Sequence, residues 1–309
     1  LQRNDWLWER KYEVDSLCYP IQLAYLLWKN TGCTSQFNED FQRGADRIIQ
    51  TFRREQNHEK NSSYRFVREN TYFTDTLSRE GKGALVKGDI GLTWSGFRPS
   101  DDACTYGYLI PSNMFAVIVL GYLEEIEKIV YHSEQMQTEA ACLRQQIEEG
   151  IGRYGIVETE DFGKIYAYEV DGFGQYNLMD DANIPSLISL PYLGYRGDAE
   201  VIRNTRRFIL SEANPYYYRG KFSCGIGSPH TPVRHVWQLA LIMQGMTSAD
   251  EREREDILRM LSETDAGTGL MHESMHVDDP SRYTREWFSW ANALFCEWIL
   301  EICGYRIVK

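Results

Sequence analysis

Two kinds of predicted helix alternate along this chain. One kind is apolar around most of its circumference and follows a polar, aromatic loop; it is predicted at residues 16–28, 114–126, 184–192, 236–245 and 291–302. The other kind is amphipathic with one charged face, and it is predicted at residues 39–54, 133–150, 199–211 and 250–263. A helix that is apolar on most sides must be buried on most sides, whereas an amphipathic helix covers a core with one face. The alternation therefore predicts inner and outer layers of helices in one closed all-α assembly.

Strand signals are few. The best candidate is residues 164–170, Lys-Ile-Tyr-Ala-Tyr-Glu-Val, in which β-branched and aromatic residues recur. The glycine-containing stretches 81–84 and 171–174 are interpreted as turns within a domain, because no linker composition surrounds them. We therefore expect a single domain over residues 1–309, with short β-hairpins in its loops.

The charge balance limits the possible partners. The 309 residues include 33 Lys and Arg against 45 Asp and Glu, which gives a net charge of -12. Nucleic acids and anionic membranes are bound by basic surfaces, so neither is expected as a partner. The negative charge also disfavours a phosphorylated substrate, whereas neutral carbohydrates remain open. No apolar run approaches the roughly 18 residues of a membrane span, so we expect a soluble protein.

The cysteines show no metal or disulfide pattern. There are seven, irregularly spaced, and none forms a C-x-x-C pair. We expect buried, reduced thiols, which favours the cytoplasm over the periplasm. We expect no cofactor and a monomer.

Loops that lead into the apolar helices carry acids beside aromatic residues. These acids are Asp15, Asp101 with Asp102, Asp180 with Asp181, and Glu286, while the loop before residue 236 carries His230 and His235 instead. An N-cap role would explain one or two such acids. If the apolar helices run in the same direction, however, all of them converge at one end, where the helix N-termini present positive dipole ends. Because aromatic rings stack on sugars and carboxylates bind hydroxyls, the recurring pattern predicts a carboxylate-lined sugar pocket.

Hydrolysis of a glycosidic bond needs a carboxylic acid and a second carboxylate. The candidates for this pair are Asp101 or Asp102 together with Glu286. Glu286 lies in Arg-Glu-Trp-Phe-Ser-Trp at residues 285–290, where two tryptophans follow it just before an apolar helix. The alternatives are an N-cap aspartate and a glutamate that is stabilised by a helix dipole.

A competing motif is His272-Glu273-Ser274-Met275-His276, which matches the H-E-x-x-H zinc signature. That signature binds zinc only when both histidines lie on one helix and a third ligand is present. The glycines at 267 and 269 and the turn residues at 278–281 leave little room for such a helix. We therefore favour sugar-binding or loop-structuring roles, and a zinc hydrolase that uses His272 and His276 is the weaker alternative.

Four segments of the chain, residues 8–20, 96–115, 179–187 and 283–292, resemble glycoside hydrolase family 125. The resemblance implies an (α/α)6 barrel and a metal-independent, inverting exo-α-mannosidase that acts on α-1,6-linked mannose of N-glycan fragments. It places the general acid in the Ser100-Asp101-Asp102-Ala103 segment and the general base at Glu286. Related helical-barrel glycosidases tend to use the first acid of such a doublet, so Asp101 is assigned as the acid, with Asp102 as the fallback.

In this mechanism Asp101 is kept protonated by burial and by neighbouring acids, and Glu286 is ionised beside Arg285 and activates water on the opposite face. The predicted stacking platforms are Trp94, Trp287 and Trp290. The predicted contacts to mannose are Asp15, Arg98, Asp102, Asn113, Asp181, Asn183, His230, His272 and Arg285. About a third of the polar contacts are expected to serve the backbone of their own loops, as loop polar residues often do.

The family also carries an earlier segment with a Trp-Leu-Arg-Asp-Ser-type motif, which this chain lacks. Five apolar and four amphipathic helices also fail to close a symmetric ring. We therefore expect further N-terminal residues that cover two apolar edges, at residues 23–28 and at Phe295, Trp298 and Ile299. A glycan-binding barrel with impaired catalysis is the alternative function.

Overall fold

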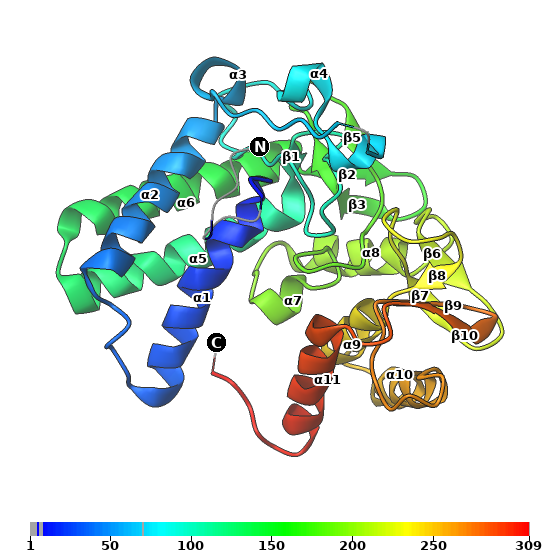
Figure 1. The fold of residues 1–309 in the computed structure, drawn as a ribbon. Coiled ribbons are helices and arrows are strands. Elements are labelled where there is room, and N and C mark those ends of the chain that lie inside the picture. Colours follow the sequence, from blue (N-terminus) through cyan, green and yellow to red (C-terminus); the bar gives the residue numbers. More distant parts are fainter. Residues whose placement is uncertain (1–4, 6–8, 70, 309) are drawn as a thin grey trace. The chain divides into compact units, whose positions relative to one another are not determined.

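The computed structural model describes residue 5, residues 9–69 and residues 71–308; Trp8, in one of the segments that carry the resemblance, lies outside this range. Helices provide most of the regular structure, and the strands are short and antiparallel (Figure 1). The chain divides into two compact units. The first unit comprises Leu1–Ile156, Ala167–Asn177 and Val308–Lys309, and the second comprises Val157–Tyr166 and Leu178–Ile307. The prediction of a mostly helical chain with small hairpins is confirmed.

Four long helices form the centre of the first unit. They are α1 (Val14–Thr31), α2 (Glu39–Glu55), α5 (Ile110–Ile126) and α6 (Glu134–Tyr154). Helix α5 packs against α1 and α6, and α2 packs on α6 (Figure 1). Most residues of α5 are buried, whereas α2 and α6 bury one face. Helices at the predicted positions 16–28, 39–54, 114–126 and 133–150 are therefore confirmed. Helix α5 is buried on most sides as predicted, whereas α1 buries only one face.

The first unit also contains one small sheet, which lies beside the start of α5. Strand β1 (Tyr108–Leu109) pairs with β4 (Glu169–Val170), which pairs with β5 (Tyr176–Asn177). Because β1 leads directly into α5, the sheet fixes the loop that precedes this helix. The remaining elements of the unit are α3 (His58–Asn61), η1 (Phe73–Asp75), α4 (Ser78–Gly81) and η2 (Glu127–Tyr131).

In the second unit, two helices pack against one apolar helix. Helix α9 (Gln238–Met246) packs against α10 (Glu251–Glu263) and α11 (Ser289–Ile302). Helix α8 (Ala199–Ile209) packs on β3 (Gly163–Tyr166), which forms a hairpin with β2 (Ile156–Thr159). The remaining elements are α7 (Leu190–Leu193), the hairpin of β6 (Tyr217–Arg219) and β7 (Cys224–Ile226), and the sheet of β8 (His235–Val236), β9 (Ser274–His276) and β10 (Asp279–Thr284).

Two predicted elements differ from the structure. The helix predicted at 184–192 is reduced to α7, because Pro185 and Pro191 disfavour helical backbone before them and the Asp180 carboxylate binds the amides of Leu187 and Ile188. The strand predicted at 164–170 is divided into β3 and β4, which pair with different partners.

The predicted apolar edges are only partly exposed. On α1, Leu23 and Leu27 are 72% and 42% exposed. On α11, Ile299 is exposed, but Trp298 is fully buried, so its predicted exposure is wrong. Its indole lies against α9, where Gly245 leaves room for it.

All seven cysteines are free. Cys18 and Cys104 are buried, as predicted, whereas Cys142, Cys296 and Cys303 are exposed, so for these three the predicted burial is wrong. Cys142 lies on a face of α6 that the unit leaves in solvent. Within the part of the chain that the structure describes, no helix has the length and apolarity needed to cross a membrane.

The loop before β1 lies close to α6 at Gly91, which has a φ of 91°. A Cβ at this position would lie 2.2 Å from the carbonyl oxygen of Gln146. We therefore expect Gly91→Ala to lower the free energy of unfolding by about 1–3 kcal/mol in urea denaturation. The matched control is Gly152→Ala in α6, the helix that Gly91 approaches. A Cβ at Gly152 would meet open space, so this variant should be neutral or stabilised by up to about 1 kcal/mol. Equal stabilities of the two variants would contradict the close approach.

Candidate active site

Asp101 lies on a tight turn in the loop before β1. The amide of Arg98 donates to the carbonyl of Asp102 at 2.8 Å, and the amide of Asp101 donates to the carbonyl of Arg98 at 2.9 Å. Asp101 has a φ of 68°, a left-handed conformation that aspartate tolerates better than most residues. The Asp101 side chain is 60% exposed, whereas Asp102 is buried. The expected burial of Asp101 is therefore wrong, and the first acid of the doublet is the accessible one.

A buried ion pair holds this turn to the small sheet. Arg98 Nε donates to Glu169 Oε1 at 2.6 Å, with the Arg98 and Glu169 side chains 6% and 0% exposed. The other carboxylate oxygen of Glu169 accepts from the amides of Thr105 and Tyr106, both at 3.2 Å, and from Asn177 Nδ2 at 3.0 Å. Because its guanidinium group binds Glu169, the structure does not support the predicted contact between Arg98 and mannose.

Lys11 supports the same turn from a neighbouring segment. Its ammonium group donates to the Asp101 carbonyl at 2.8 Å and pairs with Asp75 at 2.6 Å. The Lys11 side chain is only 6% exposed. The turn is therefore fixed by two cations, and Lys11 Nζ also lies 3.9 Å from Asp101 Oδ1, although the Asp101 carboxylate is largely exposed.

Two further acids lie at the start of α1. Asp15 is buried and accepts from Ser112 Oγ at 3.2 Å, and Glu13 accepts from Ser16 Oγ at 2.7 Å. Burial is the main cause that raises the pKa of Asp15 to about 7, with the charge of Asp101 contributing. Burial is also the main cause that raises the pKa of Glu13 to about 8, with the charges of Asp15 and Asp101 contributing. These groups can therefore hold protons near neutral pH. Asp15 was predicted from the sequence as a site residue, whereas Glu13, separated from it by one residue, was not.

Two other predicted contacts in the first unit are structural. Trp94 is fully buried, stacked on His58 with centroids 3.6 Å apart and nearly parallel to Tyr12 at 5.9 Å. Asn113 is fully buried, and its amide binds the backbone of Thr93 and Leu109. The predicted stacking platform at Trp94 and the predicted sugar contact at Asn113 are therefore not supported, because both side chains organise the core.

In the second unit, adjacent aspartates organise the loop before α7. Asp180 is fully buried and accepts from the amides of Leu187 and Ile188 at 2.8 and 3.0 Å. Asp181 and Asn183 are also buried and lie together, with both nitrogens of Asn183 3.5 Å from Asp181 Oδ1. The structure thus brings these two predicted residues together.

The Asp180 carboxyl group makes stability depend on pH. Burial raises its pKa to about 8, although the two amide bonds lower it. Because the folded-state pKa lies above the ordinary value, this contribution to stability is complete below about pH 4 and is lost as the pH rises through about 8. In Asp180→Asn, the unfolding free energy should decline less steeply between about pH 5 and 7, by up to about 1.4 kcal/mol per pH unit. Urea denaturation at several pH values measures the two slopes, and parallel slopes would contradict the prediction.

Glu286 is exposed in the loop that leads into α11. The preceding residue, Arg285, has a φ of 44°, and its Nε pairs with Glu273 Oε1 at 3.2 Å. The Glu273 side chain is 7% exposed. Arg285, which was expected to pair with Glu286, therefore pairs with Glu273, and the expected pairing is wrong.

His272 holds the Glu286 loop from inside the unit. It is fully buried, with Nδ1 2.6 Å from the Glu286 carbonyl oxygen and Nε2 3.1 Å from the Asp265 carbonyl oxygen. Its ring stacks on Tyr283 with centroids 4.0 Å apart. Both ring nitrogens therefore face backbone, and the predicted sugar contact is not supported.

The H-E-x-x-H pattern does not form a helix. His276 lies on strand β9, and its ring centroid is 5.3 Å from that of His235 on β8. Because His272 faces two carbonyl oxygens and His276 lies on a strand, the two histidines do not share a helix face. The zinc alternative therefore loses its structural basis.

Two amide side chains, which the sequence analysis did not place in the site, join this loop to helices. Gln238, at the start of α9, accepts from the His272 amide. Asn292 Nδ2 donates to the carbonyls of Met271 and Phe288, both at 2.8 Å, and its Oδ1 accepts from the Met271 amide. Each lies in the first turn of an apolar helix, and a polar side chain at such a position is the sequence signal that could have indicated its role.

The aromatic residues near Glu286 differ in exposure. Trp287 is 63% exposed and can offer a ring face to a ligand, whereas Trp290 is half-buried with its ring 6.4 Å from Phe288. His230 is exposed, with its ring centroid 6.4 Å from that of Trp237. Asp101 belongs to the first unit and Glu286 to the second. The distance between their carboxyl groups is therefore a prediction.

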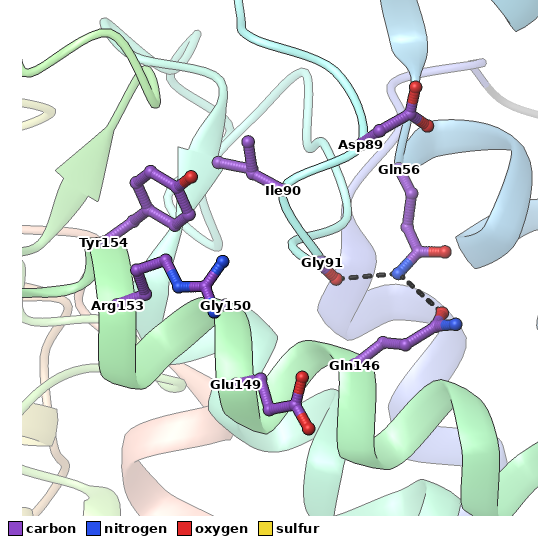
Figure 2. Close-up of a pocket in the computed structure, with 9 residues that line it drawn as sticks. All are labelled: Gln56, Asp89, Ile90, Gly91, Gln146, Glu149, Gly150, Arg153 and Tyr154. Carbon is purple, nitrogen blue, oxygen red and sulfur yellow. Dashed lines mark hydrogen bonds between the residues drawn. The ribbon is translucent and has the colours of Figure 1, made fainter.

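A cavity of about 310 Å³ lies between α2, α6 and the loop at Gly91. Gln56 Nε2 donates to the carbonyl of Gly91 at 2.7 Å and to Gln146 Oε1 at 3.3 Å. Figure 2 shows these two bonds, with Tyr154 at the other side of the cavity. None of the predicted site residues lines this cavity.

Comparison with known proteins shows one family. A sequence model described as metal-independent alpha-mannosidase (GH125) matches residues 2–300. The Meiotically up-regulated gene 157 protein of Schizosaccharomyces pombe is 43% identical over 306 residues, which cover 96% of this chain and 60% of that protein. The chain therefore spans less than two thirds of this curated relative.

A solved Streptococcus pneumoniae structure is 52% identical and superposes with a TM-score of 0.96. The match covers 99% of this chain and 72% of that one. That protein is described within a family of metal-independent alpha mannosidases in the processing of N-linked glycans, and it was solved in a non-productive substrate complex with alpha-1,6-mannobiose.

Proposed function

Because this chain belongs to glycoside hydrolase family 125, we propose that it is an inverting, metal-independent exo-α-mannosidase. Its proposed substrate is a non-reducing terminal mannose in α-1,6 linkage, on α-mannosides or N-glycan fragments. The observation that carries this proposal is the complex of the 52% identical S. pneumoniae protein with alpha-1,6-mannobiose. The proposed architecture is a single (α/α)6 catalytic domain over residues 1–309, which the alternation of apolar and amphipathic helices supports.

Asp101 and Glu286 are the proposed catalytic pair, and they share a local arrangement. Each is an exposed carboxylate on a turn that contains a non-glycine residue of positive φ, Asp101 itself and Arg285. In each turn a neighbouring arginine pairs with a buried glutamate, Arg98 with Glu169 and Arg285 with Glu273. Strained backbone of this kind costs about 1–3 kcal/mol per residue and clusters at functional sites.

In the proposed reaction, Asp101 donates a proton to the leaving oxygen while Glu286 removes a proton from the attacking water. Inversion requires the two carboxyl groups to lie about 6.5–9.5 Å apart, which leaves room for that water. A bound sugar would cover the exposed Asp101 carboxyl group. Trp287 is available as a stacking platform, and Asp15, Asp102, Asp181, Asn183 and His230 are retained as proposed contacts to hydroxyls.

The test is mannose release from α-1,6-mannobiose, followed by NMR in the first minutes of the reaction and repeated after chelation with EDTA. The expected first product is β-mannose, formed at the same rate with and without EDTA. A product of α configuration would overturn the inverting mechanism. Binding of mannobiose without release would instead support the glycan-binding alternative.

A further inference from the structure

A second cavity in the first unit is lined by arginines and hydroxyl groups. Its volume is about 570 Å³, and it lies between the C-terminal end of α2 and the segments at residues 10–12 and 62–67. The cations that line it are Arg10, Arg54 and Arg65, and the small hydroxyl groups are those of Thr51, Ser62 and Ser63. No residue that we assign to catalysis or to mannose binding lines this cavity.

The three arginines have no acidic partner within the described residues of the chain. Among the described residues, the Arg65 guanidinium group donates to the Tyr64 carbonyl, at 2.7 Å. The carboxylate of Glu55, which also lines the cavity, is buried and lies 2.6 Å from His58 Nδ1. The cavity therefore concentrates positive charge that nearby acids do not neutralise.

Ordinary structural roles explain only part of this arrangement. Arg54 lies in the last turn of α2, where a cation favours the negative end of the helix dipole. Arg10 and Arg65 lie outside helices, so the same reason does not apply to them. The whole chain has a net charge of -12, whereas the three arginines around this cavity make the local charge positive. Like charges held together repel one another, and a bound anion would relieve this repulsion.

The walls of the cavity are fixed by hydrogen bonds. The Tyr64 hydroxyl donates to the Arg10 carbonyl at 2.6 Å and accepts from the Tyr12 amide at 3.0 Å. The Tyr64 ring lies 5.9 Å from the rings of both Tyr12 and Trp94. This contact joins the segment of Arg10 to the segment of Arg65, so two of the three arginines project from a connected wall.

We propose that this cavity binds a phosphate-type oxyanion, either free or as a monoester on a small molecule such as a sugar. The planar guanidinium group donates two parallel hydrogen bonds to phosphate oxygens, and hydroxyl groups complete such a site. The volume exceeds that of phosphate alone and falls in the range of small-molecule sites, about 300–1,000 Å³. Although the net charge of the chain disfavours a phosphorylated ligand, the local charge of this cavity favours one. The proposal does not depend on mannosidase activity.

Calorimetric titration of the purified protein tests the proposal, with inorganic phosphate, mannose 6-phosphate and unphosphorylated mannose as ligands and potassium chloride at equal ionic strength as the blank. The cavity variant is Arg54→Gln with Arg65→Gln. The matched control is Arg43→Gln with Arg47→Gln, which removes the same charge from exposed positions on α2 outside the cavity. We expect saturable phosphate binding that weakens at least about tenfold in the cavity variant and is unchanged in the control.

The three ligands distinguish the source of the anion. Tighter binding of mannose 6-phosphate than of phosphate would assign the cavity to a sugar ester, and equal binding would assign it to the oxyanion alone. No saturable binding beyond the chloride blank would overturn the proposal, and so would equal weakening in both variants. If the cavity variant fails to fold, Arg54→Lys with Arg65→Lys keeps the charge and removes the forked donors, and undiminished phosphate binding by that protein would also overturn the proposal.

Discussion

Replacing Glu286 with glutamine should reduce mannose release from α-1,6-mannobiose by at least about 10²–10⁴-fold, the range of a general base. The amide is nearly isosteric with the carboxylate, and the loop is held by His272 and Arg285 through other atoms. The affinity for mannobiose, measured by calorimetry, should therefore stay within a few fold of the native value. A near-normal kcat would show that the base lies elsewhere, and Asp181 is then the next candidate.

The variant Asp101→Asn distinguishes the role of the general acid from that of the general base. It should lose a comparable factor on mannobiose, yet retain much more activity on an aryl mannoside whose leaving group needs no protonation. Glu286→Gln should lose activity on both substrates. Asp102→Asn is the control at the neighbouring position, where the side chain is buried. If Asp102→Asn rather than Asp101→Asn shows the dependence on the leaving group, the fallback assignment of the acid is correct.

The long helices could be predicted because their burial follows a regular pattern in the sequence. Helices α5 and α9 are apolar all round and are buried, whereas α2 and α10 show one charged face. The segment at 184–192 could not be predicted in this way. Its apolar residues are buried in a loop, and Asp180 supplies the hydrogen bonds that a helix would otherwise provide.

The catalytic roles of the two acids stay predictions, whereas the positions of several predicted supporting residues can be compared with the structure. The two proposed catalytic acids are both exposed on constrained turns, but Arg98, Trp94 and Asn113 project into the core. A loop sequence specifies the types of side chain and not their directions, which depend on which buried groups need partners. Glu169 illustrates the limit, because it lies in an ordinary strand segment and becomes important only through its pairing with Arg98.

The largest effect on stability is expected for Glu169→Ala. The substitution leaves the Arg98 guanidinium buried without its counter-ion and leaves the amides of Thr105 and Tyr106 without an acceptor. Loss of one partner of a buried pair costs about 3–5 kcal/mol. In the first unit, the control is Glu124→Ala, which breaks the partly exposed pair with Arg144 and should cost at most about 1 kcal/mol.

A double variant separates the buried charge from the pairing itself. Arg98→Met with Glu169→Leu removes both charges and should recover much of the stability lost in Glu169→Ala, because apolar residues often replace a buried pair without cost. It should not recover mannose release, since the turn that carries Asp101 would have lost its link to β4. Urea denaturation and the mannobiose assay measure the two effects on the same proteins. If the double variant regains full activity together with stability, the ion pair serves the fold alone, and the position of Asp101 is fixed by Lys11 and the turn.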